Sequence, residues 1–349
     1  MKLFAAPLNL PLSEPFVTAR GPRTEAHNVA VRVEHEGVVG VGEAAPIARF
    51  SQTQQGALEA LHGVVLEAPA DLAALERQLD ALAPRFVGQE AALCALDIAL
   101  HDWLGRARAA PLWRLFGLQP TRVRTSMTVS LQSPSSAAAR AAQLGERFAL
   151  LKVKLGGSQD EALIEAVRAR CPEAGLRADA NEGWTNPNHA LAMMAALAAA
   201  RFELVEQPLP AGQWHFARRL EHRAPLPMFA DEDLAGALDA EKLSCLAGCY
   251  HGVNVKLDKV GGLLPARRWI AAARAQQLSV MVGCMASSSL AIAAAAQIAP
   301  LCDVVDLDGS LLLARDPFEG LEIEGDEIVL ADRPGHGVTA VLADAVEIR

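Results

Sequence analysis

Short apolar runs alternate with longer segments of helical periodicity through most of this chain. From residue 123 onward the unit is an apolar run, a turn and an alanine-rich amphipathic segment, repeated about every 25 residues. The eight apolar runs are RTSMTVSL, ALLKVKL, GLRADAN, RFELVEQ, PMFADED, GVNVKLD, LSVMVGC and DVVDLDG. Eight strands alternating with helices predict an α/β fold of the TIM-barrel type.

The residues before this repeat follow a different pattern. HNVAVRVEHE and GVVGVGEAAP alternate apolar and polar positions, which predicts an antiparallel hairpin, and residues 52–118 then show helical periodicity. The segment after Gly320 is again polar and strand-like. We therefore expect an α+β domain at 1–120, a barrel at 121–320 and a segment at 321–349 that returns to the first domain.

Composition narrows the class of protein. Of the 349 residues, 51% are hydrophobic and 21% charged, and the net charge of −9 comes without a lysine or arginine block, so neither nucleic acid nor a membrane is an expected partner. No apolar run reaches spanning length, and prolines interrupt the N-terminal segment before a signal-like core forms, so we expect a cytoplasmic protein. The six cysteines lack paired spacing and are expected to be buried thiols.

Five charged residues recur at nearly constant intervals along the repeat. Lys154, Asp179, Glu206, Asp231 and Lys256 are separated by 25, 27, 25 and 25 residues. Each stands at the far end of an apolar run, which is where a barrel gathers its catalytic side chains. The spacing predicts that three carboxylates and two lysines meet at one mouth of the barrel.

The three carboxylates, Asp179, Glu206 and Asp231, belong to successive predicted strands and would lie side by side. Buried carboxylates repel one another and lose hydration at high cost unless a cation binds them. Oxygen ligands suit a hard cation, which predicts Mg²⁺, with Mn²⁺ as a substitute. The alternative is that each acid forms a separate salt bridge at its strand end.

Lys152 and Lys154 are two positions apart on one predicted strand and therefore point to the same face. Two buried ammonium groups lower each other's pKa, and such a lysine beside a cation can act as general base toward a weakly acidic carbon proton. Lys256 stands on the sixth strand, across the barrel from the second, so that a base would face each side of one carbon centre, as two-base racemisation requires. A solvated lysine pair, or a salt bridge between Lys256 and a nearby acid, is the alternative.

Asp306 and Asp308 share a face of the eighth predicted strand. They could bind an ammonium group of the substrate through charge-assisted hydrogen bonds. They could equally pair with Lys256 or Arg315, and the spacing does not choose between these interpretations.

Five motifs occur in an order typical of one enzyme family: KVK at 152–154, DANEGW at 179–184, EQPLP at 206–210, DED at 231–233 and NVKLDKVGG at 254–262. Through them almost the whole chain resembles the enolase superfamily, specifically its muconate-lactonizing subgroup. The resemblance implies an α+β capping domain on a modified TIM barrel, (β/α)7β. It further implies Mg²⁺ held by the three acids, α-proton transfer by Lys154 and Lys256, and support of the resulting enediolate by Lys152.

Within that subgroup, GCM at 283–285 followed by DLDGSLLL at 306–313 resembles the dipeptide epimerases. This implies that Asp306 and Asp308 hold the free α-ammonium group of a dipeptide, whose C-terminal residue is inverted at its α-carbon. Many relatives carry Glu where this chain has Ser287, so one carboxylate of that region is missing.

Substrate specificity in this family is set largely by two loops of the capping domain, which correspond to residues 17–24 and 45–53. Arg23 resembles the arginine that meets an acidic side chain in L-Ala-D/L-Glu epimerases, so an Ala-Glu dipeptide is the expected substrate; a surface position for Arg23 is the alternative. Thr128 and Cys284 are expected to bind the same substrate.

Other reactions of the subgroup are alternatives. A cycloisomerase or an o-succinylbenzoate synthase shares the metal and the lysines but needs no ammonium site, and the acylated nitrogen in an N-acylamino-acid racemase substrate carries no positive charge. A catalytically silent homologue is a further alternative, although a scaffold needs neither lysine. Barrels of this kind often associate, so a homo-oligomer is also expected as one state of the protein.

Overall fold

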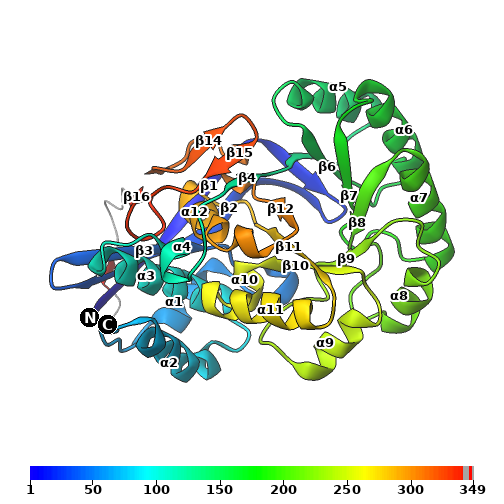
Figure 1. Cartoon of the computed structure of the whole chain (residues 1–349). Coiled ribbons are helices and arrows are strands. Elements are labelled where there is room, and N and C mark those ends of the chain that lie inside the picture. The colour runs from blue at the N-terminus through cyan, green and yellow to red at the C-terminus, as the bar shows by residue number, and fades with distance from the viewer. Residues whose placement is uncertain (341–345, 348–349) are drawn as a thin grey trace.

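A computed structural model describes residues 1–340 and 346–347. The chain forms an antiparallel sheet in the order β17-β1-β2-β3 and an eight-stranded parallel sheet in the order β12-β11-β10-β9-β8-β7-β6-β5. The two sheets occupy opposite sides of the molecule, with helices between and around them (Figure 1). This arrangement confirms the predicted α/β class, with a barrel and a separate N-terminal antiparallel unit.

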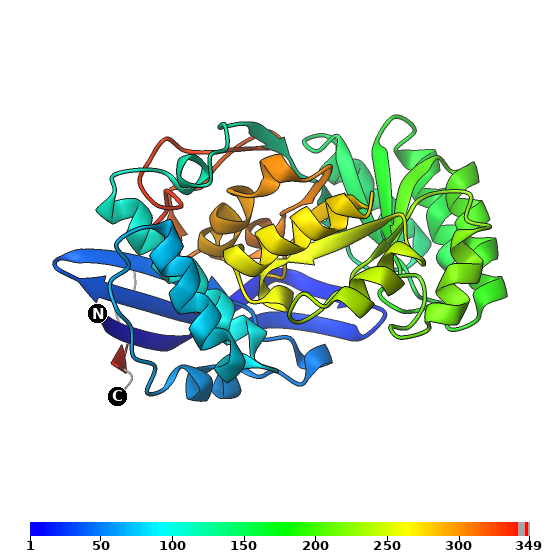
Figure 2. The ribbon, with the colours of Figure 1, turned by 60° about the horizontal axis from the view of Figure 1, so that its bottom comes forward.

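The N-terminal sheet is built on a long hairpin of β1 (Lys2–Thr18) and β2 (Gly21–His35), to which β3 (Val38–Ala44) adds antiparallel. The pairing of β2 with β3 confirms the predicted hairpin. The tip of the β1–β2 hairpin, residues 17–24, extends from this sheet to the barrel (Figure 2). There Leu131 N donates a hydrogen bond to Val17 O at 2.9 Å.

The strand β1 is longer than its sequence indicates, because Pro7 and Pro11 interrupt the alternating pattern. Proline cannot donate to a ladder and is therefore tolerated where one edge of a strand is unpaired. Within the described residues, β17 (Val346–Glu347) pairs only with Phe4 and Ala5, so the prolines lie beyond the ladder on that edge.

Helix α3 (Glu90–Ala107) is buried along nearly its whole length and packs against β3. Glycine permits this approach, since a Cβ at Gly42 would lie 2.0 Å from Ala95 O. We call β1 to β3 and the helices between β3 and β4 the cap. Besides α3, these helices are η1 (Ala48–Phe50), α1 (Gln54–Leu61), α2 (Leu72–Leu82), η2 (Ala83–Phe86) and α4 (Leu112–Leu115).

All eight predicted barrel strands are present, and they are parallel and follow one another in chain order. Their carboxyl ends form what is called the barrel mouth below. The strands are β5 (Met127–Val129), β6 (Leu150–Lys154), β7 (Gly175–Asp179), β8 (Phe202–Glu206), β9 (Met228–Ala230), β10 (Gly252–Lys256), β11 (Ser279–Gly283) and β12 (Val304–Asp306).

Among the described residues, the first and last strands of the barrel, β5 and β12, are not joined by the backbone hydrogen bonds of a ladder, unlike the other neighbouring strands. Side chains bridge this seam instead: Ser126 Oγ donates to Asp306 Oδ1 at 2.6 Å, and Thr128 N donates to Asp308 Oδ2 at 2.8 Å. The two aspartates of the eighth strand therefore help to close the barrel.

Helices surround the outer face of the barrel (Figure 1). They include α5 (Pro134–Gly145), α6 (Asp160–Arg170), α7 (Pro187–Ala199), α8 (Trp214–Glu221), α9 (Ala240–Ala247) and α11 (Leu263–Ala275). The other helical segments after barrel strands are α10 (Leu257–Val260), which packs on α3 of the cap, α12 (Ser289–Ala296), which packs on β3, and η3 (Ala299–Leu301) and η4 (Gly309–Leu312). In the part of the chain that the structure describes, no helix has the length and apolar character needed to cross a membrane.

After β12 the chain returns to the cap. Leu112 N donates to Gly335 O at 2.9 Å, and His336 N donates to Asp102 Oδ1 at 3.1 Å. Residues 341–345 and 348–349 of the predicted C-terminal segment lie outside the described residues. The remaining strands are β4 (Arg122–Arg124), which pairs with β15 (Glu327–Val329), β14 (Glu322–Glu324), which also pairs with β15, and β13 (Phe318–Glu319), which pairs with β16 (Thr339–Ala340).

Candidate active site

The five evenly spaced charged residues meet at the barrel mouth. Lys154, Asp179, Glu206 and Lys256 are the last residues of β6, β7, β8 and β10, and Asp231 directly follows β9. Each is at most 7% exposed. Because β6 and β10 are four positions apart in an eight-stranded barrel, the two lysines come from opposite sides, with the three acids on the strands between them.

Lysine ammonium groups lie between the carboxylates. Lys152 Nζ is 3.2 Å from Asp179 Oδ2 and 2.7 Å from Glu206 Oε2. Lys256 Nζ is 3.7 Å from Glu206 Oε1 and 2.8 Å from Asp231 Oδ2. Among the described residues, no three acidic, cysteine or histidine side chains converge closely enough to enclose a metal ion, since positive charge already separates these acids.

The chemistry of the three acids nevertheless fits a hard cation. In the described part of the chain, Glu206 Oε2 is buried and makes no hydrogen bond, although Lys152 lies within ion-pair distance. Asn254 Nδ2 donates to Glu206 Oε1 at 2.8 Å, while Asn254 Oδ1 has no hydrogen-bond partner there. Buried oxygen atoms without donors, beside carboxylates on neighbouring strands, match the ligands that Mg²⁺ prefers.

The acids have very different proton affinities. Burial, followed by repulsion from the Asp179 carboxylate, raises the pKa of Glu206 to about 7. Burial also opposes ionisation of Asp179, but the ammonium groups of Lys154 and Lys152 outweigh it and lower its pKa. Lys256 and Lys259 likewise hold the pKa of Asp231 well below its usual value. The neighbouring lysines thus favour the ionised forms of Asp179 and Asp231, whereas burial favours the protonated form of Glu206.

The expectation that the paired lysines have lowered pKa values is wrong for Lys152. Burial favours its neutral form, but the carboxylates of Asp306, Glu206 and Asp179 outweigh burial and raise its pKa well above the usual value. The pKa of Lys256 is raised for the same reason, chiefly by Asp231 against the effect of burial. Three acids around the lysines dominate over the repulsion between the lysines themselves.

The aspartates of the eighth strand are not equivalent. Asp306 Oδ2 lies 2.7 Å from Lys152 Nζ, so its ion pair is with Lys152 rather than with Lys256 or Arg315. Asp308 accepts a hydrogen bond from Thr128 N, and the Cys284 Sγ lies 3.9 Å from Asp308 Oδ1. Thr128, Cys284 and Asp308 are therefore brought together at the seam of the barrel.

The two cap loops reach the mouth through arginines. Arg20, in the hairpin tip, donates to Glu232 Oε1 at 2.8 Å, and Arg49, in the second loop, makes two hydrogen bonds to Glu182 of 2.8 and 2.9 Å. Arg23 is exposed and forms no ion pair among the described residues. The residue as a whole is exposed, but its guanidinium group is partly covered, and this partial burial, followed by repulsion from Arg20, lowers its pKa.

Some residues at the mouth are not identified by the sequence pattern. Lys259 lies in α10, is 2% exposed, and donates to Asp231 Oδ1 and to Asn254 O. Asn254, a polar residue in the middle of the largely apolar β10, gives only a weak signal in the sequence. The pairing of Arg20 with Glu232 carries none, since 212 residues separate the two.

Comparison with known proteins gives matches along nearly the whole chain. Residues 2–117 match the mandelate racemase / muconate lactonizing enzyme N-terminal domain, and residues 135–344 match the enolase C-terminal domain-like family. An L-Ala-D/L-Glu epimerase of Bacteroides thetaiotaomicron is 36% identical, over 98% of this chain and 88% of its own. The L-Ala-D/L-Glu epimerase of Escherichia coli K12 is 37% identical, over 92% of this chain and 97% of its own.

A solved structure is also similar throughout. The crystal structure of a dipeptide epimerase from Enterococcus faecalis V583, complexed with Mg and the dipeptide L-Leu-L-Tyr, aligns with a TM-score of 0.90 and 29% sequence identity. The alignment covers 97% of this chain and 99% of that one.

Proposed function

The chain belongs to the mandelate racemase and muconate lactonizing enzyme family of the enolase superfamily, and we propose that it is a Mg²⁺-dependent dipeptide epimerase. The reaction inverts the α-carbon of the C-terminal residue of the dipeptide. The observation that carries this proposal is the placement of Lys154 and Lys256, buried on opposite strands with three acids on the strands between them.

The two lysines act on opposite faces of one carbon. One neutral lysine removes the α-proton of the substrate, and the other, as an ammonium group, returns a proton to the opposite face. The intermediate is an enediolate, and the Lys152 ammonium group stabilises its negative charge. Lys154 Nζ lies 2.6 Å from Asp179 Oδ2, which holds that lysine in place.

Asp179, Glu206 and Asp231 are the residues that would hold Mg²⁺. Bound there, Mg²⁺ would stabilise negative charge on the substrate carboxylate and, by neutralising the acids, lower the pKa of the neighbouring lysines toward the range of a general base. We propose Mn²⁺ as a substitute, since it accepts the same oxygen ligands.

The substrate is held at both ends. Asp308 faces the seam with Thr128 and Cys284 and, together with Asp306, is proposed to bind the α-ammonium group of the dipeptide. Arg23, which has no ion-pair partner among the described residues, is proposed to bind an acidic side chain of the C-terminal residue. An L-Ala-L/D-Glu dipeptide satisfies both requirements.

The proposed function goes with a division of the chain into three parts. We propose a capping domain at 1–120, a catalytic barrel at 121–320 and a C-terminal segment at 321–349 that returns to the cap. The hydrogen bonds from Leu112 N to Gly335 O and from His336 N to Asp102 Oδ1 support the return to the cap. The cycloisomerase, o-succinylbenzoate synthase and N-acylamino-acid racemase reactions would use the same lysines without an ammonium site.

Proton NMR in D₂O tests the proposal. The enzyme with Mg²⁺ is incubated with L-Ala-L-Glu, and the α-proton signal of the C-terminal residue is followed together with the appearance of the L,D diastereomer. Exchange with inversion is the expected result. If no dipeptide of a panel exchanges its α-proton, although calorimetry shows that the enzyme binds Mg²⁺, the dipeptide epimerase proposal is wrong. The reactions that need no ammonium site would then be favoured.

A further inference from the structure

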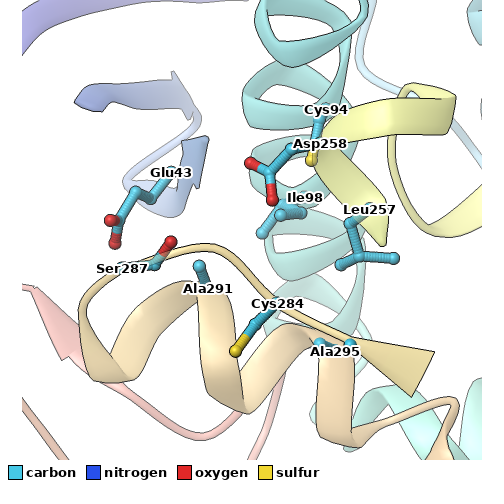
Figure 3. A pocket seen from close by; sticks show the side chains of 10 residues that line it. Glu43, Cys94, Ile98, Leu257, Asp258, Cys284, Ser287, Ala291 and Ala295 are labelled. Atoms are coloured by element: carbon cyan, nitrogen blue, oxygen red, sulfur yellow. The ribbon is translucent and has the colours of Figure 1, made fainter. Parts of the chain in front are cut away.

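A small cavity lies where the cap meets the barrel, beside helix α10, which follows Lys256. Its volume is about 10 Å³, and its polar lining consists of Glu43 from β3, Asp258 from α10 and Ser287 from the loop before α12. Figure 3 shows these three side chains around the cavity. The remaining lining is mostly apolar and includes Ile98, Leu257, Ala291 and Ala295.

Both acids are buried and hold the cap to the barrel. Glu43 accepts hydrogen bonds from Asn28 Nδ2 at 2.7 Å, from Ser288 N at 3.0 Å and from the Ser288 hydroxyl. Asp258 Oδ1 accepts from Ala45 N at 2.7 Å. Neither acid forms an ion pair with a basic side chain in the part of the chain that is described.

Ser287 supplies a second and independent observation. It is 1% exposed, and its Oγ has no hydrogen-bond partner among the described residues. A buried hydroxyl without a hydrogen-bond partner is unfavourable, so a ligand that supplies a partner is favoured there.

The size and polarity of the cavity match one ligand. A cavity needs roughly 10–15 Å³ and two to four polar partners to hold a water molecule, and this cavity meets both conditions. A metal ion would require about six oxygen ligands, more than the polar groups that line it.

We propose that this cavity binds one water molecule, which bridges Glu43, Asp258 and Ser287, and that Asp258 is thereby a positioning residue for Lys256 and for the loop 45–53. Asp258 stands two residues after Lys256, and its partner Ala45 begins that loop. One carboxylate thus fixes both the strand end that carries the base and the cap loop that covers the substrate.

The charge of the two acids is consistent with a shared proton. Burial raises the pKa of Glu43 to about 7 and that of Asp258 to about 6. The charged and titratable groups that face them are each other, the Lys256 ammonium group from β10, the Cys94 thiol from α3 and the Cys284 thiol that follows β11. A water molecule between the acids can donate to the ionised one and accept from the protonated one.

A crystal structure that shows ordered waters tests the site itself. One density peak within hydrogen-bond distance of Glu43, Asp258 and Ser287 is expected. A dry cavity, or one closed by rearranged side chains, would overturn the water site. This measurement needs no substrate, so its failure is distinct from a failure of the proposed epimerase reaction.

The positioning role rests on that proposed function and is tested by kinetics. Asp258→Ala leaves the Ala45 N–H without an acceptor and is expected to raise KM for the dipeptide about tenfold, whereas Asp258→Asn keeps an acceptor oxygen and should stay within about threefold of the native KM. Ser287→Ala should raise KM about threefold, because the water loses a partner.

Asp326→Ala is the matched control, since Asp326 also accepts from a backbone N–H, that of Ala149, but at the opposite end of the barrel. Its KM should not change. Equal KM values for the two Asp258 variants, or a KM for Ser287→Ala that equals the native value, would overturn the positioning role. If Asp258→Ala fails to fold, the KM values of Ser287→Ala and Asp258→Asn still test the positioning role.

Discussion

Lys152 Nζ lies 2.7 Å from Asp306 Oδ2 and so joins the second barrel strand to the eighth. The same ammonium group lies 2.7 Å from Glu206 Oε2. One lysine therefore connects the proposed metal ligands with the proposed binding site for the substrate ammonium group. The Asp306 carboxylate already forms an ion pair with Lys152. Among the described residues, Asp308 forms no ion pair with a lysine.

This difference predicts distinct effects at the two aspartates. Asp308→Asn should raise KM for a free dipeptide about tenfold or more, since a charge-assisted hydrogen bond to the substrate is lost. Asp306→Asn should mainly lower kcat, because it releases Lys152. Steady-state kinetics with L-Ala-L-Glu measures both, and the N-acetylated dipeptide serves as control. Identical changes in kcat and KM for both variants would contradict the assigned difference.

The two lysines should each serve one face of the substrate. Lys154→Met and Lys256→Met should both abolish inversion, yet each should retain α-proton exchange with only one of the two diastereomers, because the remaining base reaches only one face. Proton NMR in D₂O with L-Ala-L-Glu and L-Ala-D-Glu measures this. Lys2→Met, an exposed change in the cap, is the control. Exchange of both diastereomers in either variant would exclude the two-base arrangement.

Removal of one proposed metal ligand should abolish activity. Glu206→Gln is expected to weaken Mg²⁺ binding and to lower kcat about a thousandfold or more, since a charged ligand of the ion is lost. Isothermal titration with Mg²⁺ and turnover are measured in parallel. Glu203→Gln changes an acid of the same strand that pairs with Arg177 outside the site, and it should bind Mg²⁺ normally. Normal Mg²⁺ affinity in Glu206→Gln would remove Glu206 from the metal site.

Arg23 should determine preference for an acidic side chain. Arg23→Met is expected to lower kcat/KM for L-Ala-L-Glu about tenfold, through loss of an ion pair with the substrate, and to leave L-Ala-L-Leu unchanged. The ratio of kcat/KM for the two dipeptides is the measurement, so each protein provides its own control. An unchanged ratio would return Arg23 to the status of a surface residue.

The buried Glu43 should make stability depend on pH. Its pKa is 4.5 when unperturbed and about 7 in the folded protein, so folding favours the protonated form. The stabilisation is fully present below about pH 4.5 and is lost as the pH rises to about 7, and a shift of this size corresponds to about 3 kcal/mol.

Glu43→Gln cannot ionise, so its unfolding free energy lacks the loss that ionisation of Glu43 causes over this range. Urea denaturation from pH 5 to pH 8 in EDTA compares it with the native protein, and their difference should grow with pH. Glu206 and Glu232, whose pKa values burial also raises to about 7, are present in both proteins and cancel in the difference. A difference that stays constant with pH would show that Glu43 does not hold a proton.

The sequence by itself determined the barrel and the location of its charged residues. Strand and helix periodicity are local properties, and a parallel barrel brings the carboxyl end of every strand to one mouth. Asp179 and Glu206 stand at the carboxyl ends of their strands. The barrel therefore brings them together independently of how individual side chains pack. The extent of β1 is not a local property, because a strand tolerates prolines only where the edge that they face is unpaired.

Only the tertiary structure decided which charged groups contact each other. Asp306 could have paired with Lys256 or Arg315, and the barrel geometry selects Lys152 instead. The contact between Arg20 and Glu232 spans 212 residues and depends on how far the hairpin tip extends. Spacing along a chain fixes the strand on which a side chain stands, but an ion pair needs atoms within about 4 Å, and that distance is set by packing across the whole fold.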